Sequence, residues 1–138
     1  MASWTCKGCG RRFGRVNQSH QCAPAGTVEQ YFAARPPAQR RAYEAVVRHL
    51  RKLGPLHVEA VSVVVMFKRS RSFAEVRARR DHLELAFLLS RQVDHPRIAK
   101  RLQLSANRAA HYVALRAASD VDRQVRDWLT ESYASSPL

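Results

Sequence analysis

The spacing of apolar residues along the chain changes from a helical to a strand period near residue 55. From Ala38 to Leu53 apolar side chains recur every three or four residues, which predicts an amphipathic helix that Gly54 and Pro55 end. Residues 57–68 are rich in β-branched side chains and predict one largely buried strand. Ahead of the long helix, Thr27 to Gln30 has the composition of a capping box and predicts a brief helix.

Further strands are predicted after this segment. Arg69 to Ser72 is typical of a hairpin turn, and residues 73–80 and 82–90 follow as a second and a third strand. Connections this short require antiparallel pairing. A fourth strand is expected at His111 to Leu115 and a final helix near residues 120–133. The pattern therefore predicts an α+β domain in which an antiparallel sheet packs on helices on one face.

Alternation along the strands assigns the two faces of this sheet, because successive side chains point to opposite sides. The face expected to pack on the helices carries Val61, Val63, Val65, Phe67, Ala74, Val76, Ala78, Leu83, Leu85, Phe87 and Leu89. The opposite face carries Met66, Lys68, Phe73, Arg77, Arg79, His82 and Glu84. Such a cationic face with an exposed aromatic ring could stack bases or bind phosphate, and a plain solvated face is the other interpretation. A register shift of one residue would exchange the two faces.

The first 22 residues hold all three cysteines of the chain. Cys6 and Cys9 have the spacing at which two thiolates bind one tetrahedral ion from a tight turn. His20 and Cys22 then supply an imidazole and a third thiolate. Zinc suits this mixture of nitrogen and sulfur, and four protein ligands leave no open position for water. The sequence thus predicts one structural Zn²⁺ in an N-terminal finger of residues 1–25, ahead of an α+β domain of residues 26–138.

Four features complete the predicted finger. Gly8 and Gly10 suit the turn between the first two ligands, because glycine tolerates positive φ. Trp4 and Phe13 are the expected miniature core. The segment from Ala23 to Gly26 consists of small and turn-forming residues and is expected to be a flexible linker. A finger this small cannot bury enough surface to fold alone, so metal binding should supply its folding free energy.

Charge directs attention to polyanions. The chain carries a formal net charge of +13, and such a field attracts nucleic acid. Within the finger, Lys7, Arg11, Arg12 and Arg15 stand without any acidic residue. Arginine greatly outnumbers lysine, which a GC-rich coding bias could also explain, so charge alone does not decide the matter.

Several other classes of protein find little support in the sequence. No apolar run approaches the roughly 20 residues that span a bilayer, and no apolar stretch near the first residue resembles a signal peptide, so we expect a cytoplasmic protein. No nucleophile elbow, phosphate-cradling loop or spaced histidine and carboxylate pair indicates catalysis. Residues 98–107 resemble the opening of a helix-turn-helix, but the β-prone His111, Tyr112 and Val113 interrupt the second helix that this motif requires.

Two stretches, Met66 to Arg77 and Asp120 to Tyr133, resemble a bacterial family known as domain of unknown function 5655. Similar members often begin with a finger like the one from Trp4 to Cys22. The resemblance covers nearly the whole chain and implies an α+β fold. It implies no activity, because the family has no established biochemical role. This chain has a serine before Tyr133 where the family pattern has alanine.

We therefore expect a non-enzymatic, zinc-containing basic protein that binds nucleic acid, either DNA or RNA, through the finger and the basic sheet face. The candidate contacts are Lys7, Arg11, Arg12, Arg15, Lys68, Phe73, Arg77, Arg79 and His82. Two alternatives stay open. One is a small-molecule binding protein or enzyme that takes an anionic ligand on the open sheet face, and the other is an adaptor whose finger docks a partner protein.

Overall fold

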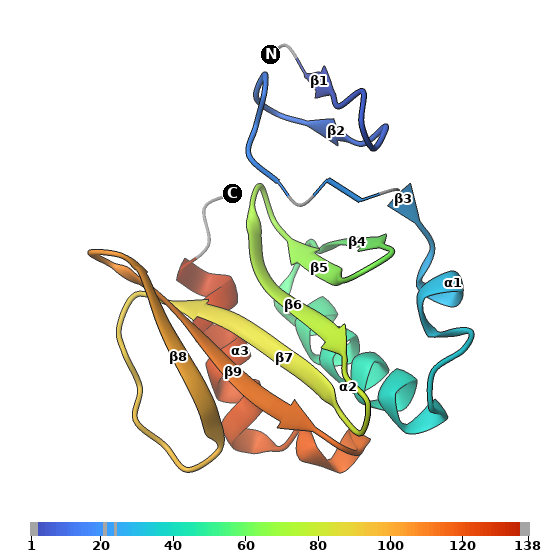
Figure 1. Ribbon diagram of the computed structural model, residues 1–138. Coiled ribbons are helices and arrows are strands. Elements are labelled where there is room, and N and C mark those ends of the chain that lie inside the picture. Colours follow the sequence, from blue (N-terminus) through green and yellow to red (C-terminus); the bar gives the residue numbers. More distant parts are fainter. Residues whose placement is uncertain (1–2, 21, 24, 136–138) are drawn as a thin grey trace.

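The computed structural model describes residues 3–20, 22–23 and 25–135, and within them the chain forms an α+β fold with two antiparallel sheets (Figure 1). The small sheet pairs β1 (Trp4–Thr5) with β2 (Arg12–Phe13). The large sheet has the strand order β3-β4-β5-β6-β7-β9-β8. Its elements are β3 (Ala25–Gly26), β4 (His57–Val61), β5 (Val65–Lys68), β6 (Ser72–Ala78), β7 (Leu83–Leu89), β8 (Ile98–Ser105) and β9 (Arg108–Leu115). The helices are α1 (Val28–Phe32), α2 (Pro37–Leu53) and α3 (Arg123–Ser135), with a short 3-10 turn, η1 (Ala118–Asp120), before α3.

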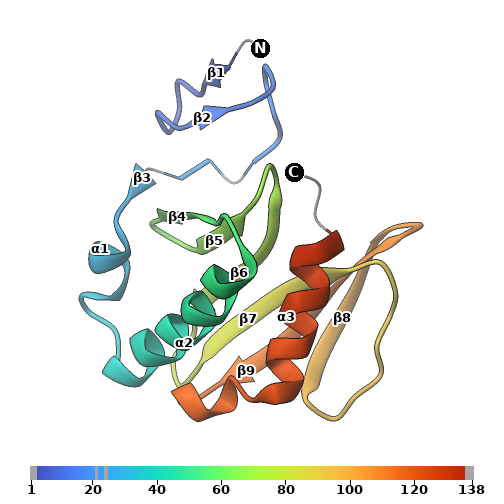
Figure 2. The ribbon, with the colours of Figure 1, turned by 180° about the vertical axis from the view of Figure 1, so that it is seen from behind.

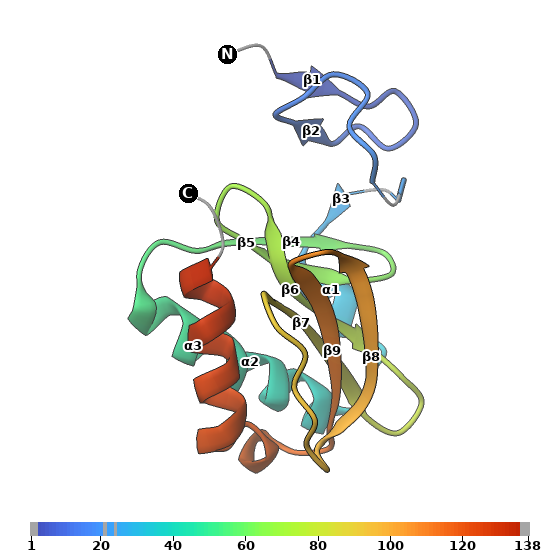
Figure 3. The ribbon, with the colours of Figure 1, turned by 90° about the vertical axis from the view of Figure 1, so that its left-hand side faces the viewer.

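The two longer helices cover one face of the large sheet (Figures 2 and 3). α2 buries Ala42, Val46 and Leu50 completely against the core, as its apolar spacing requires. α3 begins three residues later than expected, because the Asp122 side chain caps it by accepting a hydrogen bond from the Val125 amide at 3.0 Å. The capping box before α1 is present as predicted, with Thr27 and Gln30 bonded in both directions. Within the described residues no helix is long and apolar enough to cross a membrane.

The prediction of a single strand over residues 57–68 is wrong. Residues 62–64 turn the chain, so that β4 and β5 form a hairpin in which the Val61 amide donates to the Val64 carbonyl at 2.9 Å. Val63 lies in this turn and is 38% exposed, rather than in the core. A run of valines without glycine or proline gives no signal for a turn, which explains the error.

The predicted faces of β6 and β7 are correct with one exception. Ala74, Val76, Leu85 and Phe87 lie on the helix-covered face as expected. Phe73 was expected on the open face, but it is only 3% exposed and its ring meets Tyr133 of α3 edge-on at 5.6 Å. The register between β5 and β6 shifts by one residue beside it, and such a bulge turns a side chain to the other face. Phe73 is therefore not a stacking platform for bases.

The alternative of a helix-turn-helix over residues 98–107 is also wrong. This segment is β8, an edge strand paired with β9, and β9 starts three residues before the predicted His111. Almost all of β8 is exposed, so its apolar residues follow no buried face. Leu102 and Leu104 are half-exposed on this edge strand.

His111 on β9 fixes the loop between β7 and β8. Its ring is fully buried and stacks on Phe87 with centroids 5.6 Å apart. Nδ1 lies 3.2 Å from the Ala109 carbonyl, so this nitrogen carries the proton and Nε2 accepts a hydrogen bond from the Val93 amide at 3.0 Å. Burial, reinforced by the nearby Arg101, lowers the pKa of His111 below its ordinary value. The neutral ring is thus the form that the fold requires.

We predict that the free energy of unfolding falls as the pH drops below about 6.5, because the unfolded chain then binds a proton that folded His111 resists. The measurement is denaturant unfolding of the wild type and of His111→Gln at about pH 7.5 and 5.5. The variant should be less stable at the higher pH and should lose less stability on acidification. His57→Gln, which changes an exposed ring 4.0 Å from Glu59, is the comparison and should keep the stability of the wild type at the higher pH. An equal pH dependence in wild type and His111→Gln would contradict this account.

Candidate metal centre

The first two cysteines lie on a tight knuckle between β1 and β2. The Cys6 amide donates to the Arg11 carbonyl at 2.9 Å, and the Gly10 amide donates to the Cys6 carbonyl at 2.7 Å. Gly10 has a φ of +74°, a conformation that glycine adopts without steric cost. These bonds close the turn and bring the Cys6 and Cys9 side chains to one side of it.

Three thiols and one imidazole converge at this knuckle. The ligand atoms of Cys6, Cys9, His20 and Cys22 all lie within 4.8 Å of one another. The sulfur atoms of Cys6 and Cys22 are 3.7 Å apart, and the Cys9 sulfur is 3.5 Å from His20 Nε2. Bond lengths of about 2.3 Å to sulfur and 2.0–2.1 Å to nitrogen at tetrahedral angles imply separations of about 3.8 and 3.6 Å. The spacing fits one tetrahedral ion, whereas a disulfide needs about 2.05 Å.

The imidazole is oriented for metal binding. His20 Nδ1 lies 2.7 Å from the Gln18 carbonyl oxygen, so Nδ1 carries the proton and the Nε2 lone pair faces the thiols. The ring packs on Phe13 with centroids 4.1 Å apart and meets Trp4 at 5.9 Å. Trp4 and Phe13 thus form the predicted small core, and that core holds a ligand in place.

The thiols are prepared for ionisation to different extents. Burial opposes ionisation of Cys6, but hydrogen bonds from the backbone at Cys9 and Gly8 outweigh it and lower the Cys6 pKa to about 6. Its hydrogen bond with Cys6, followed by burial, raises the pKa of Cys22 to about 11. A divalent cation between the sulfurs would favour the thiolate at every position, because a metal ligand must be deprotonated. The residues therefore suit a metal ion that keeps all three sulfurs charged.

The finger is fastened to the sheet by charges. Arg11 is 5% exposed, and its Nε donates to Glu59 of β4 at 2.6 Å. Lys68 of β5 binds the other oxygen of the same carboxylate at 2.5 Å. Partial burial raises the pKa of Glu59, but the hydrogen bonds from Lys68 and Arg11 outweigh it and hold that pKa below its ordinary value. The stabilisation by these pairs is thus complete at neutral pH and is lost only as the pH falls through the lowered value.

Two sequence predictions need correction at this junction. Arg11 was expected to contact phosphate, but its guanidinium is committed to Glu59 and lies 5.1 Å from the centre of the Phe13 ring. The linker was expected to be flexible from Ala23 to Gly26. Ala23 is instead buried in a cluster with Val61 and Val64, and Ala25–Gly26 is strand β3, paired with β4. Pro24 lies outside the described residues.

A hollow of about 450 Å³ separates the finger from the β5–β6 turn, and we call it the junction hollow. Among the described residues, its lining carries five cationic side chains, Arg12, Arg15, Lys68, Arg69 and Arg71, together with His57 and one acidic residue, Glu59. Glu59 is already paired with Arg11 and Lys68, and Arg69 donates to the Tyr133 carbonyl at 2.9 Å. The arrangement can therefore attract an anion to a concave surface.

The structure distributes the remaining candidate residues differently from the prediction. Lys7 is exposed on the finger but does not line the junction hollow. Arg77 pairs with Glu75 at 2.8 Å and Arg79 with Glu84 at 2.9 Å. His82 likewise lies 2.7 Å from Asp81. Lys68 is likewise paired with Glu59, so this face of the sheet is closer to neutral than the sequence suggested.

Sequence reasoning missed Arg69, Arg71 and Glu59 as parts of this surface. Arg69 and Arg71 belong to a segment that was interpreted only as a turn, although two arginines at a hairpin tip are themselves a signal for anion binding. Glu59 gave no signal, because its role depends on the docking of a finger nearly fifty residues away in the chain.

Gly8 offers a direct test of the metal centre. A Cβ atom at this position would lie 2.8 Å from the Cys22 sulfur, which cannot move without distorting the tetrahedron. We expect Gly8→Ala to lower metal affinity roughly 10- to 100-fold, a loss typical of disturbed ligand support. Gly14→Ala is the matched control, because nothing lies within 4 Å of its added methyl group. Competition with a chromophoric chelator measures both, and equal affinities would contradict the geometry.

Comparison with known proteins adds a family but no activity. No curated protein and no solved structure matches the chain. The family model "Domain of unknown function (DUF5655)" matches residues 28–136, which run from the start of α1 to the end of α3 and leave the finger outside. Because the match covers most of the chain, this protein belongs to the DUF5655 family.

Proposed function

We propose that this protein uses one structural Zn²⁺ to hold a basic finger against its DUF5655 domain, and that it binds nucleic acid in the junction hollow. The observation that carries the proposal is the lining of that hollow, in which Arg12, Arg15 and Arg71 are exposed and the carboxylate of Glu59 is already paired. The cations come from two parts of the chain that only the docked finger brings together.

The donor set supports zinc over other metals. Three sulfurs and one imidazole nitrogen at tetrahedral spacing are typical of structural zinc sites. With all four positions taken by protein, no water is activated, so the metal would supply folding free energy and no chemistry. Because Arg11 lies in the metal-binding knuckle and pairs with Glu59, the finger would dock on the sheet only when the metal is bound.

Phosphates are the best-fitting anions for the junction hollow. Arg12 and Arg15 are exposed on the finger, and Arg71 is exposed on the opposite wall, so their charges face solvent rather than a core. Arginine presents a planar array of donors that matches phosphate oxygens. Several cations spaced over a concave surface favour a polymer of phosphates over a single small anion.

Metal content is the first test. Purified protein should hold one zinc per chain by native mass spectrometry, and Cys22→Ser should lose it while residues 26–138 keep their helical circular dichroism signal. Ser19→Ala, an exposed change beside His20, is the control and should retain the metal. Another resident metal, or a disulfide among the three cysteines, would refute the zinc assignment.

Nucleic-acid binding is the second test. Fluorescence anisotropy with labelled single- and double-stranded DNA and RNA at about 50 and 200 mM salt should show binding that weakens steeply with salt. The double variant Arg12→Ala/Arg15→Ala should reduce the salt slope by about two, one for each lost phosphate contact.

The matched control removes the same charge elsewhere. Arg41 and Arg51 are exposed on α2, outside the lining of the junction hollow. If Arg41→Ala/Arg51→Ala weakens binding as much as the finger variant, the net charge of the protein and not the hollow would explain the affinity. Absence of binding at the lower salt would remove the nucleic-acid function altogether.

A further inference from the structure

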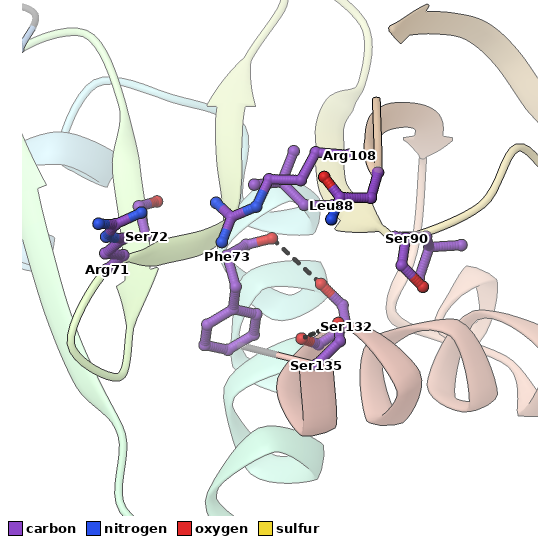
Figure 4. A pocket seen from close by; sticks show the side chains of 10 residues that line it. Arg71, Ser72, Phe73, Leu88, Ser90, Arg108, Ser132 and Ser135 are labelled. Atoms are coloured by element: carbon purple, nitrogen blue, oxygen red, sulfur yellow. Dashed lines mark hydrogen bonds between the residues drawn. The ribbon is translucent and has the colours of Figure 1, made fainter. Parts of the chain in front are cut away.

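Two smaller hollows adjoin the junction hollow and share lining residues with it or with each other. Arg71 lines both the junction hollow and a small polar hollow, which we call the arginine–serine hollow (Figure 4). Ser72, Phe73 and Leu88 line this second hollow and also a third, apolar one on the open sheet face. The three hollows are therefore neighbours in one row. The row is basic at the finger, narrows to about 40 Å³ at the arginine–serine hollow and is apolar on the open sheet face.

The arginine–serine hollow has the donors of a phosphate site. Arg108 reaches from the start of β9 toward Phe73, and Arg71 lies on the far side at the start of β6 (Figure 4). No carboxylate of residues 3–20, 22–23 or 25–135 lines it. Among the described residues, the Arg71 and Arg108 guanidiniums, the Ser90 hydroxyl and the Asn107 amide have no intramolecular partner. The C-terminus of α3 opposes an anion here, but its charge of about −0.5 is small against two guanidiniums.

The serine hydroxyls of α3 do not compete for these arginines. Ser132 Oγ donates to the Phe73 carbonyl at 3.2 Å, and Ser135 Oγ donates to the Ser132 carbonyl at 3.2 Å, as the dashed lines in Figure 4 show. These bonds fix the wall of the hollow. The donors left for a ligand thus come from the two turns at the end of the sheet.

The apolar hollow has a volume of about 240 Å³ and a floor of small side chains. Ala86 of β7 and Ala110 of β9 form part of the floor, and Tyr112 and Leu104 stand at its sides. Leu104 is 53% exposed, which is unusual for a large apolar side chain. Alanines beneath an aromatic side chain leave room for a flat ring to lie on the sheet.

Among the described residues, Glu75 is the charged residue in the lining of this apolar hollow, and one of its carboxylate oxygens is 2.8 Å from Arg77 Nε. Lys100 Nζ lies 4.9 Å from the centre of the Tyr112 ring. The N–H groups of an uncharged heterocycle could donate hydrogen bonds to the Glu75 oxygens. The arginine–serine hollow thus offers cations for a phosphate, and the apolar hollow next to it offers an apolar surface with a hydrogen-bond acceptor.

We infer, building on the proposed function, that the nucleic acid is single-stranded: a phosphate lies between Arg71 and Arg108, and an unpaired base enters the apolar hollow beside Tyr112. A base in a duplex is stacked and paired, so it cannot enter a pocket on the sheet. Base contacts with aromatic side chains tolerate any sequence. The junction hollow binds the backbone of either form, and the apolar hollow selects the unpaired one.

The test fills the apolar hollow without changing any charge. Ala110→Leu adds bulk to its floor, and Ala114→Leu makes the same change on the same face of β9 outside its lining. Affinities of both variants and the wild type are measured with a single-stranded oligonucleotide of about ten nucleotides and with the matching duplex. Ala110→Leu should lose about fivefold or more in single-strand affinity and keep its duplex affinity. Ala114→Leu should lose neither.

Ala110 is buried, so the larger side chain could disturb folding, and a second variant therefore tests the inference independently. Arg108→Ala should lower the single-strand salt slope by about one and leave the duplex slope unchanged. Arg116→Ala, which removes an exposed charge at the other end of β9, is its control and should change neither slope.

Two results would overturn the inference. One is equal affinity of the wild type for single strand and duplex, and the other is unchanged single-strand binding in both Ala110→Leu and Arg108→Ala. If Arg12→Ala/Arg15→Ala still weakened binding in that case, the junction hollow would keep its proposed role. Absence of binding to either form would instead remove the proposed function together with this inference.

Discussion

A single carboxylate joins the two parts of this protein. One oxygen of Glu59 accepts a hydrogen bond from Arg11 of the finger, and the other accepts a hydrogen bond from Lys68 of the sheet. A guanidinium as buried as that of Arg11 is tolerated only when it is paired, and removal of one partner of such a pair costs about 3–5 kcal/mol where burial is complete. The position of the finger depends on this pair, together with the burial of Ala23 and the pairing of β3 with β4.

The charge pair in turn depends on the metal centre. The Arg11 carbonyl accepts a hydrogen bond from the Cys6 amide. The Arg11 side chain leaves the knuckle at the point where Phe13 packs against His20. A finger with a core of two aromatic residues has little folding free energy of its own, whereas zinc binding supplies about 10–16 kcal/mol in comparable peptides. Ligand geometry, aromatic packing and docking are thus successive consequences of one coordination event, if zinc occupies the site as we propose.

The sequence predicted those features that depend on local spacing. The four ligands, α2 and the capping box before α1 each leave a pattern that a few residues carry, and the structure places them as expected. Features that depend on pairing across the sheet could not be predicted from the sequence. The turn at 62–64 hides in a run of valines, and the inward position of Phe73 results from a register shift against β5. Edge strand β8 lacks a buried face and so lacks the alternation that reveals strands.

The candidate site shows the same division. Lys7, Arg12 and Arg15 could be selected by charge alone, but charge could not distinguish them from Arg11, which is buried on Glu59. Arg69 and Arg71 line the junction hollow because the finger folds back over their turn, and the open face is closer to neutral because Glu75 of β6 and Glu84 of β7 pair with its arginines. The net charge of the whole chain indicates neither of these two features.

The outer edge of the sheet has a consequence for the behaviour of the protein at high concentration. β8 leaves one side of its backbone unpaired, which is the usual starting point for strand exchange between molecules. Its register against β9 breaks twice, between Ile98 and Lys100 and between Gln103 and Ser105. Bulges of this kind, next to the cations Lys100 and Arg101, interrupt the even row of hydrogen-bonding groups that another strand would need. The irregular edge therefore protects a large open sheet from growing into aggregates.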